Sequence, residues 1–409
     1  MSGPIRFSWW KSLRVERRRS IARLLPVALL LAAVGLLISV RSSASQVSAY
    51  LVCARQVSEE YPLLYPPGTR LGRVAGGTVL LVDGFDLTSR PRLSYAADRV
   101  LFSARREGER YSQIWEMAVE GGTPRKVIPQ ASDCVTPEFL PDGSIVFSRL
   151  QPAPGRRQIG TLYVLAPDGD LSRISFGADL DLIERILEDG RILVRRLSSL
   201  HPDGIRLALR PDGTELERYL EEGPACSSTD EGVGPHGRIQ PTVADSVGPI
   251  SAPSGLEPGL QIVDSIRVAP RVPPPVSTSV VNRRMGYGWL LCLDARLSDL
   301  GGSLERAHRV RVVDATSGQT LGVEPLATDG SIYLKVPSDR LLRLEVLDDG
   351  GRVLARQTDG IWVRPNEHRG CVGCHEPRYL SPENRSPLAL EQAPIEVAGA
   401  KAAPVKGRP

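Results

Sequence analysis

The sequence predicts an all-β protein in which partial or small β-propeller repeats precede a β-sandwich domain, with a membrane helix at the N-terminus. Three observations carry this prediction: short apolar runs that recur 45 and 47 residues apart, strands of alternating polarity in the C-terminal third, and an apolar segment behind a basic cluster. Charges nearly balance, with 51 Lys and Arg against 47 Asp and Glu, so composition gives no reason to expect a nucleic-acid partner.

Repeated strands fill residues 51–220. The run Val100-Leu101-Phe102-Ser103 recurs at residues 145–148 and 192–195, and a second strand follows each copy. Pro-Asp-Gly turns separate the strands, because Pro presets φ and Gly accepts a positive φ. A period of 40–50 residues is typical of propeller blades, and the stretch resembles the WD40-like repeats of TolB-type propellers. Three copies are clear and a fourth is predicted from Leu71 to Leu93, whereas six blades do not fit this length.

The first fifty residues are predicted to be an export segment. Five arginines lie between Arg14 and Arg23, and the apolar run 24–40 follows. Its 17 residues span about 25 Å as a helix, the lower limit for crossing a bilayer. The helix either remains as an anchor with its basic end in the cytoplasm, or is removed by cleavage after Ala44. Both outcomes place the rest of the chain on the periplasmic side of the inner membrane.

Composition changes after the repeats. Residues 221–280 are rich in Pro, Gly and Ser, which predicts a linker or a long irregular excursion, and a C-terminal domain separable from the repeats. Alternating strands return in residues 281–385, for example at 331–336 and 342–346, and predict a small β-sandwich. Residues 386–409 are expected to form a disordered tail.

The chemical motif of the chain is Cys371-Val372-Gly373-Cys374-His375. Cys-x-x-Cys-His is the attachment motif of c-type haem. Its two thiols bond the two vinyl groups on one porphyrin edge, and the histidine that follows is placed to coordinate the iron as the proximal ligand. With 6 Cys and 5 His in the chain, chance produces only about 0.001 such motifs. We therefore expect one covalent haem c at Cys371, Cys374 and His375.

Two other uses of these residues stay open. Zinc accepts a ligand set of His368, Cys371, Cys374 and His375, although the adjacent Cys374 and His375 are poorly placed for two tetrahedral corners. A disulfide between Cys371 and Cys374 is the other alternative, since exported thiols often pair. Four cysteines lie outside the motif, and sequence does not decide how they pair: Cys53, Cys134, Cys226 and Cys292. Cys292 falls in an apolar run and is expected to be a buried thiol.

The C-terminal third resembles the middle domain of the hydrazine synthase alpha subunit and its relatives. The resemblance covers residues 271–377 and is carried by the stretches 286–294, 329–337 and 362–376. It implies a preceding propeller and a c-type haem. Alpha subunits of this family carry a second c-type haem in a further domain, and this sequence has no second Cys-x-x-Cys-His. The resemblance therefore implies the fold and the haem, but not hydrazine synthesis.

The sixth iron ligand is open. No Met or His follows His375, so a simple class I cytochrome, with its Met downstream of the motif, is excluded. Met285 is the possible distal ligand, because only 3 Met exist and it precedes a family-like strand. His308, His368 and Tyr379 are the other candidates, and water or an open position is the remaining alternative.

Three functions fit these features. The first is a monohaem c-type cytochrome acting in electron transfer or as a redox accessory protein, with a redox partner protein and the propeller as docking platform. The second is a haem enzyme acting on a small nitrogen or oxygen species. The third is a propeller binding module whose haem is structural or sensory. Sequence does not determine the oligomeric state.

Overall fold

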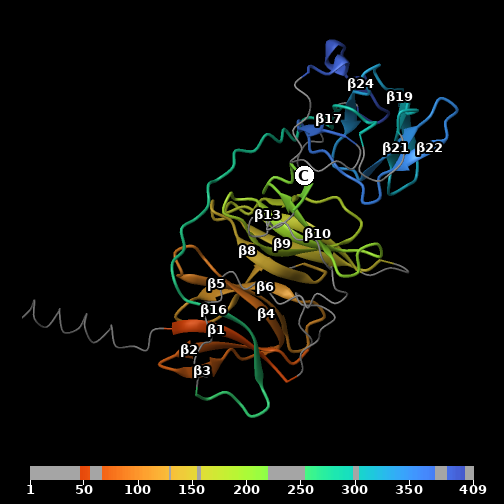
Figure 1. The fold of residues 1–409 in the computed structure, drawn as a ribbon. Helices are drawn as coiled ribbons and strands as arrows, with labels where there is room; N and C mark the ends of the chain where they lie inside the picture. The colour runs from red at the N-terminus through yellow and green to blue at the C-terminus, as the bar shows by residue number, and fades with distance from the viewer. Residues whose placement is uncertain are drawn as a thin grey trace, which may run out of the picture.

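The computed structural model describes residues 47–55, 67–128, 130–153, 158–219, 254–297, 304–373 and 385–400. In these ranges the chain forms strands β1 to β24 and one 3-10 helix, η1 (Leu388–Glu391), so the predicted all-β class is confirmed. Figure 1 shows the propeller units in succession, with the C-terminal domain beyond the last of them. Within the described ranges, no helix has the length and apolar character to cross a membrane. The helix expected at 24–40 lies outside them.

Four units of four strands occupy the region of the predicted propeller repeats, and we refer to them as the propeller units. The first two are separate sheets: β1 (Val47–Ala54), β2 (Arg70–Ala75), β3 (Thr78–Leu81) and β16 (Gln261–Arg267), then β4 (Phe85–Leu93), β5 (Arg99–Arg106), β6 (Gln113–Ala118) and β7 (Arg125–Ile128). The third contains β8 (Cys134–Phe139), β9 (Ile145–Gln151), β10 (Ile159–Leu165) and β11 (Leu171–Arg173). The fourth contains β12 (Leu180–Ile186), β13 (Ile192–Leu197), β14 (Ile205–Leu209) and β15 (Glu217–Arg218), and a parallel bridge from Gly160 to Leu180 joins it to the third.

The predicted Pro-Asp-Gly turns close hairpins in the third and fourth units. In each turn the aspartate side chain accepts the N–H of the residue two positions later, at 2.9–3.0 Å. The glycine then takes a φ of 85–90°, which a side chain would resist. The turns are those of Asp142 and Gly143, Asp168 and Gly169, and Asp212 and Gly213. This local chemistry explains why the repeat was visible in the sequence.

The first unit differs from the sequence prediction. A fourth copy was expected from Leu71 to Leu93, but β4 (Phe85–Leu93) belongs to the second unit. The first unit is instead completed by β16, which pairs antiparallel with β1 and comes from the segment expected to be a linker. Tyr50 is fully buried in β1, so residues 47–50, which the sequence assigned to the export segment, belong to the first sheet. Pairing between such distant segments leaves no local pattern.

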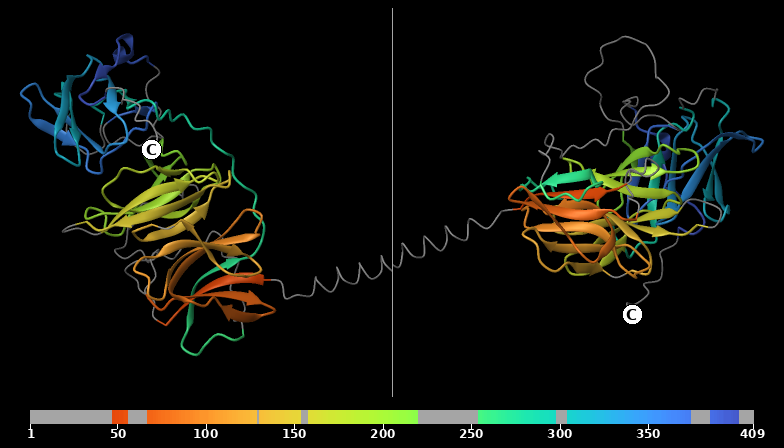
Figure 2. Two further views of the ribbon diagram at one scale, coloured as in Figure 1. Left: turned by 180° about the vertical axis from the view of Figure 1, so that it is seen from behind. Right: turned by 90° about the horizontal axis from the view of Figure 1, so that it is seen from below.

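The segment after β16 is an irregular excursion that lies along the propeller, as Figures 1 and 2 show. Arg271 donates from its guanidinium to the carbonyl of Leu93 at 2.9 Å. Farther along, Ser279 Oγ donates to Asp212 Oδ2 at 2.8 Å. These contacts hold residues 271–279 against the second and fourth units, which fits the irregular excursion for this part of the predicted linker. Residues 221–253 of that segment lie outside the described residues.

Two four-stranded sheets form the C-terminal sandwich. One has the order β23 (His368–Cys371), β17 (Tyr287–Cys292), β20 (Ile332–Pro337), β24 (Ile395–Glu396), and the other β19 (Thr320–Pro325), β18 (Arg309–Asp314), β21 (Leu342–Leu347), β22 (Val353–Arg356). Strand β24 pairs with β20, and Val397 and Ala400 are buried. The sandwich therefore continues to Ala400, and the expectation of a disordered tail from residue 386 is wrong for residues 386–400.

A buried interface centred on Trp362 joins the sandwich to the propeller. Trp362 is 0% exposed and packs edge-on against Phe176, with 6.2 Å between ring centroids. Its Nε1 donates to the Gly213 carbonyl at 3.0 Å, and Arg364 Nε donates to the Asp212 carbonyl at 2.9 Å. A sandwich cut from the propeller would expose this indole and lose both bonds. The structure thus argues against the predicted separability.

Candidate functional site

Strand β23 places Cys371 inside the sandwich. It runs parallel to β17, with His368 opposite Trp289 and Cys371 opposite Cys292. Gly288 permits this arrangement, because a Cβ there would lie 2.4 Å from Val363 Cγ1 and 2.7 Å from the Arg364 carbonyl oxygen. The chain before β23 therefore passes close against β17, and its direction into the strand is defined by backbone packing.

Alternation along β23 separates two sets of side chains. Arg369 and Cys371 point into the space between the sheets, whereas His368 is exposed and stacks on Trp289 with 4.0 Å between ring centroids. His368 and Cys371 thus lie on opposite faces of one strand. This argues against the zinc alternative that uses both. Cys374 and His375, its other two ligands, lie outside the described residues.

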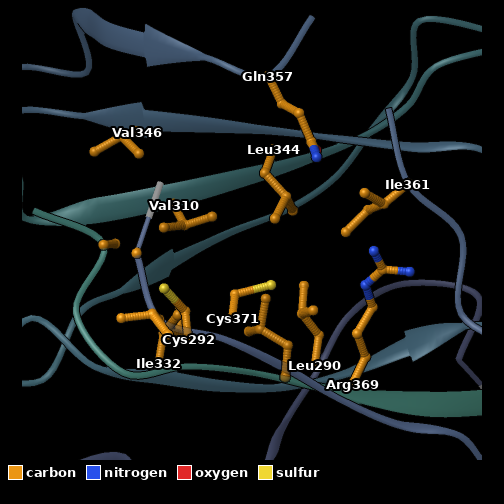
Figure 3. A pocket seen from close by; sticks show the side chains of 14 residues that line it. Leu290, Cys292, Val310, Ile332, Leu344, Val346, Gln357, Ile361, Arg369 and Cys371 are labelled. Atoms are coloured by element: carbon orange, nitrogen blue, oxygen red, sulfur yellow. The ribbon is translucent and has the colours of Figure 1, made fainter. Parts of the chain in front are cut away.

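A cavity of about 190 Å³ lies between the two sheets, and Cys371 forms part of its wall (Figure 3). Its lining is mainly apolar and comes from both sheets, with Leu290, Ile332, Val310, Leu344 and Val346 among its members. Two polar side chains, Gln357 and Arg369, join them. Gln357 Oε1 is buried and finds no hydrogen-bond partner among the described residues. The cavity is thus an apolar space with two thiols, those of Cys292 and Cys371, one cation and one unsatisfied amide at its walls.

These residues fit one edge of a haem. The thiol of Cys371 is the group that bonds a vinyl substituent, and the apolar walls suit the macrocycle. A volume of about 190 Å³ is below the roughly 300–1,000 Å³ of sites that enclose a whole ligand. A haem at Cys371 would therefore need residues outside this cavity, and Cys374 and His375 of the motif lie outside the described part of the chain.

The candidate distal ligands that the structure describes do not gather at this cavity. Met285 precedes β17, at the opposite end of that strand from Cys292, and the strand alone spans roughly 16 Å. His308 is half exposed, and its Nε2 lies 3.7 Å from Asp349 Oδ2. His368 faces outward, as described above, and Tyr379 lies outside the described residues. Met285 as a distal ligand therefore stays a prediction that the placement of its strand does not favour.

Glu367 connects β23 to the propeller. Its Oε1 accepts the N–H of Glu215 at 2.9 Å, and its Oε2 accepts the N–H of Arg364 at 2.6 Å. Burial raises the pKa of Glu367 above its ordinary value of 4.5, and the two backbone N–H donors oppose this shift. Arg369 also donates to the carbonyl of Leu216 in the propeller. One short stretch of chain thus contacts the propeller and the cavity.

Sequence reasoning found Cys371 but missed the other polar residues of the cavity. Gln357 and Arg369 have no motif, and their role appears only when two sheets bring them together. Arg369 carried one usable signal, since it lies two residues before Cys371 and so shares its face of a strand. Gln357 lies outside the strands of the sandwich, and no periodic pattern marks it.

Comparison with known proteins bears on the C-terminal domain first. Residues 300–376 match the family model of the hydrazine synthase alpha subunit middle domain. The matched span contains β18 to β23 and the whole Cys371–His375 motif. It confirms the resemblance that the sequence suggested for this third of the chain. Among curated proteins, none matches the chain.

Solved structures extend the likeness beyond the middle domain. A chain of the Kuenenia stuttgartiensis hydrazine synthase superposes with a TM-score of 0.67 at 15% identity, over 84% of this chain and 71% of that one. A TolB from Agrobacterium tumefaciens matches with a TM-score of 0.31 at 20% identity, over 42% of this chain and 69% of that one. The TolB from Acinetobacter baumannii gives 0.31 at 12% identity, over 80% and 67%. The fold of the hydrazine synthase chain is therefore shared across both the propeller units and the middle domain.

Proposed function

We propose that this chain is a c-type cytochrome with one covalent haem, held by Cys371 and Cys374 and coordinated by His375. The observation that supports this most is the position of Cys371. Its thiol, the first of a Cys-x-x-Cys-His motif, lines a mainly apolar cavity instead of facing solvent. When bound, the haem supplies reversible one-electron chemistry. In the chain itself, Cys371 holds one edge of the haem and the apolar walls of the cavity exclude water. Arg369 places a positive charge nearby.

Electron transfer, or a redox accessory role, is the function we assign to this haem. Burial in an apolar shell tunes the potential of a haem, and a covalent edge keeps it in place during turnover. The propeller serves as the docking platform for a redox partner protein in this proposal. Support comes from the interface at Trp362 and Glu367, which ties the segment leading to Cys371 to the last propeller unit.

We place the chain on the periplasmic side of the inner membrane, anchored by residues 24–40 or released after cleavage. The basic cluster before that run supports this orientation. A reporter that is active only in the cytoplasm, fused after Pro409, should be inactive, while a reporter that needs export should be active. Activity of the cytoplasmic reporter would overturn the proposed location.

A haem enzyme acting on a small nitrogen or oxygen species is the second candidate. It is favoured by one observation: no Met or His in the described part of the chain lines the cavity beside Cys371. An iron without a sixth protein ligand binds small molecules, whereas six-coordinate low-spin iron suits electron transfer.

Carbon monoxide binding to the ferrous protein separates the two candidates. A low-spin spectrum that resists carbon monoxide supports electron transfer, and ready binding supports the enzyme. We expect Met285→Ala to leave the spectrum unchanged, because Met285 lies at the far end of β17 from Cys292. If the variant turns a low-spin iron high-spin or opens it to carbon monoxide, Met285 is the distal ligand after all.

A further inference from the structure

The cavity holds a second thiol beside that of Cys371. Cys292 is in register with Cys371 on the neighbouring parallel strand, and both residues line the same cavity. Cys292 is 9% exposed. Sequence reasoning treated it as an ordinary buried thiol, because nothing local connects residues so far apart in the chain. Cys292 therefore lies next to another thiol, that of the first cysteine in the predicted haem motif.

The backbone geometry suits a bond between these two sulfurs. Neighbouring strands lie about 4.7–4.9 Å apart, and the Cα atoms of a disulfide lie about 4.4–6.8 Å apart. Both side chains leave the sheet on the face that borders the cavity. In Figure 3 they enter it side by side, with their sulfurs turned away from each other. A change between staggered χ1 positions, for which the cavity leaves room, turns them together.

We propose that Cys292 and Cys371 form a disulfide across strands β17 and β23 in the haem-free exported protein, and that this bond must be reduced before Cys371 accepts haem. Both halves of this proposal rest on the proposed export of the chain, and the second half rests also on the proposed haem. Oxidation breaks two S–H bonds and forms one S–S bond. The two electrons and two protons pass to a protein disulfide of the oxidising compartment, which becomes a dithiol. A dithiol reductant reverses the step by thiol–disulfide exchange.

The other described cysteines do not compete for this pairing. Cys53 lies in β1 and Cys134 in β8, both fully buried in the propeller units. Burial raises the pKa of both thiols, to about 12 for Cys134, which keeps them protonated and slow to exchange. Cys226 and Cys374 lie outside the described residues, so the experiment must separate their pairing with Cys371 from that of Cys292.

The first arm maps disulfides in the full-length exported chain, produced without a cytochrome c maturation system so that no haem is attached. The protein is trapped with an alkylating agent, digested without reduction and analysed by mass spectrometry. We expect a linked peptide pair containing Cys292 and Cys371, lost on reduction, in the wild type and in Cys374→Ser. Alkylation of Cys292 before reduction, or a link from Cys371 to Cys374 in the wild type, overturns the proposal.

The second arm measures covalent haem after the maturation system is supplied, with and without a dithiol reductant. We expect attachment to the wild type to depend on the reductant, and attachment to Cys292→Ala to proceed without it. Cys134→Ala is the matched control and should keep the dependence of the wild type. Equal attachment to wild type and Cys292→Ala without reductant overturns the gating step. Absence of haem from every variant under all conditions overturns the proposed function instead. In that case the linked peptide of the first arm still decides whether the disulfide forms.

Discussion

Replacing both motif cysteines, as Cys371→Ser with Cys374→Ser, should abolish covalent haem. A serine hydroxyl does not form the thioether bonds to the vinyl groups, so haem is no longer retained when the chain is denatured. The wild type, produced with a cytochrome c maturation system, should carry one haem per chain through a denaturing gel. Haem staining of the gel and the pyridine haemochrome spectrum of the purified protein measure both results.

Two further measurements make this test specific. Cys53→Ala removes a buried thiol from β1, away from the sandwich, and should retain full haem staining. Metal analysis of the wild type addresses the zinc alternative. Stoichiometric zinc and no haem in the wild type would show that the central proposal is wrong.

Trp362→Ala should lower the free energy of unfolding by about 3–5 kcal/mol, the usual cost of removing a large aromatic side chain from a core. Trp362 is fully buried between Phe176 and the Gly213 turn, so its loss also removes contacts that hold the sandwich to the propeller. We therefore expect urea unfolding, followed by haem absorbance and far-ultraviolet circular dichroism, to separate into two transitions. The sandwich should unfold first, because it loses its contact with the larger unit.

Matched variants distinguish loss of the interface from loss of a core residue. Trp115 is buried in β6, and its Nε1 donates to the Ala104 carbonyl at 3.0 Å, the same bond length that Trp362 makes. Trp115→Ala should destabilise the propeller but leave the contact between the propeller and the sandwich in place. Haem absorbance and circular dichroism should therefore respond to it differently from their response to Trp362→Ala. Trp362→Phe keeps a ring but loses the indole donor, and should cost about 1 kcal/mol. Coincident transitions with an unchanged midpoint in Trp362→Ala would contradict the interface role.

Local chemistry made the strands and turns predictable. The Asp142 and Asp212 turns are encoded within three residues, since an aspartate accepts a nearby N–H and the glycine after it adopts a positive φ. Strands such as β20 are predictable from alternating apolar and polar residues, because one face of the strand meets the core and the other meets solvent. The motif at Cys371 was equally predictable from the sequence, since haem attachment requires a fixed spacing between the two cysteines and the histidine.

Pairing between distant segments was not predictable in the same way. Strand β16 completes the first propeller unit from beyond residue 260, and β24 extends the sandwich past its expected end. Neither strand has a turn that fixes its register to a neighbour. Their partners are chosen by the burial of apolar faces that belong to other parts of the chain.

By itself, the sequence determined the all-β class, the repeating units, the resemblance of the C-terminal third and the proposed haem-attachment residues. Only the tertiary structure decided which residues surround Cys371. Cys292 and Gln357 reach the same cavity through strand register and sheet packing, and Trp362 joins two domains that composition predicted to be separable. The physical reason is the range of the interactions: turns and covalent motifs act within a few residues, whereas a cavity or an interface exists only after distant surfaces have been buried together.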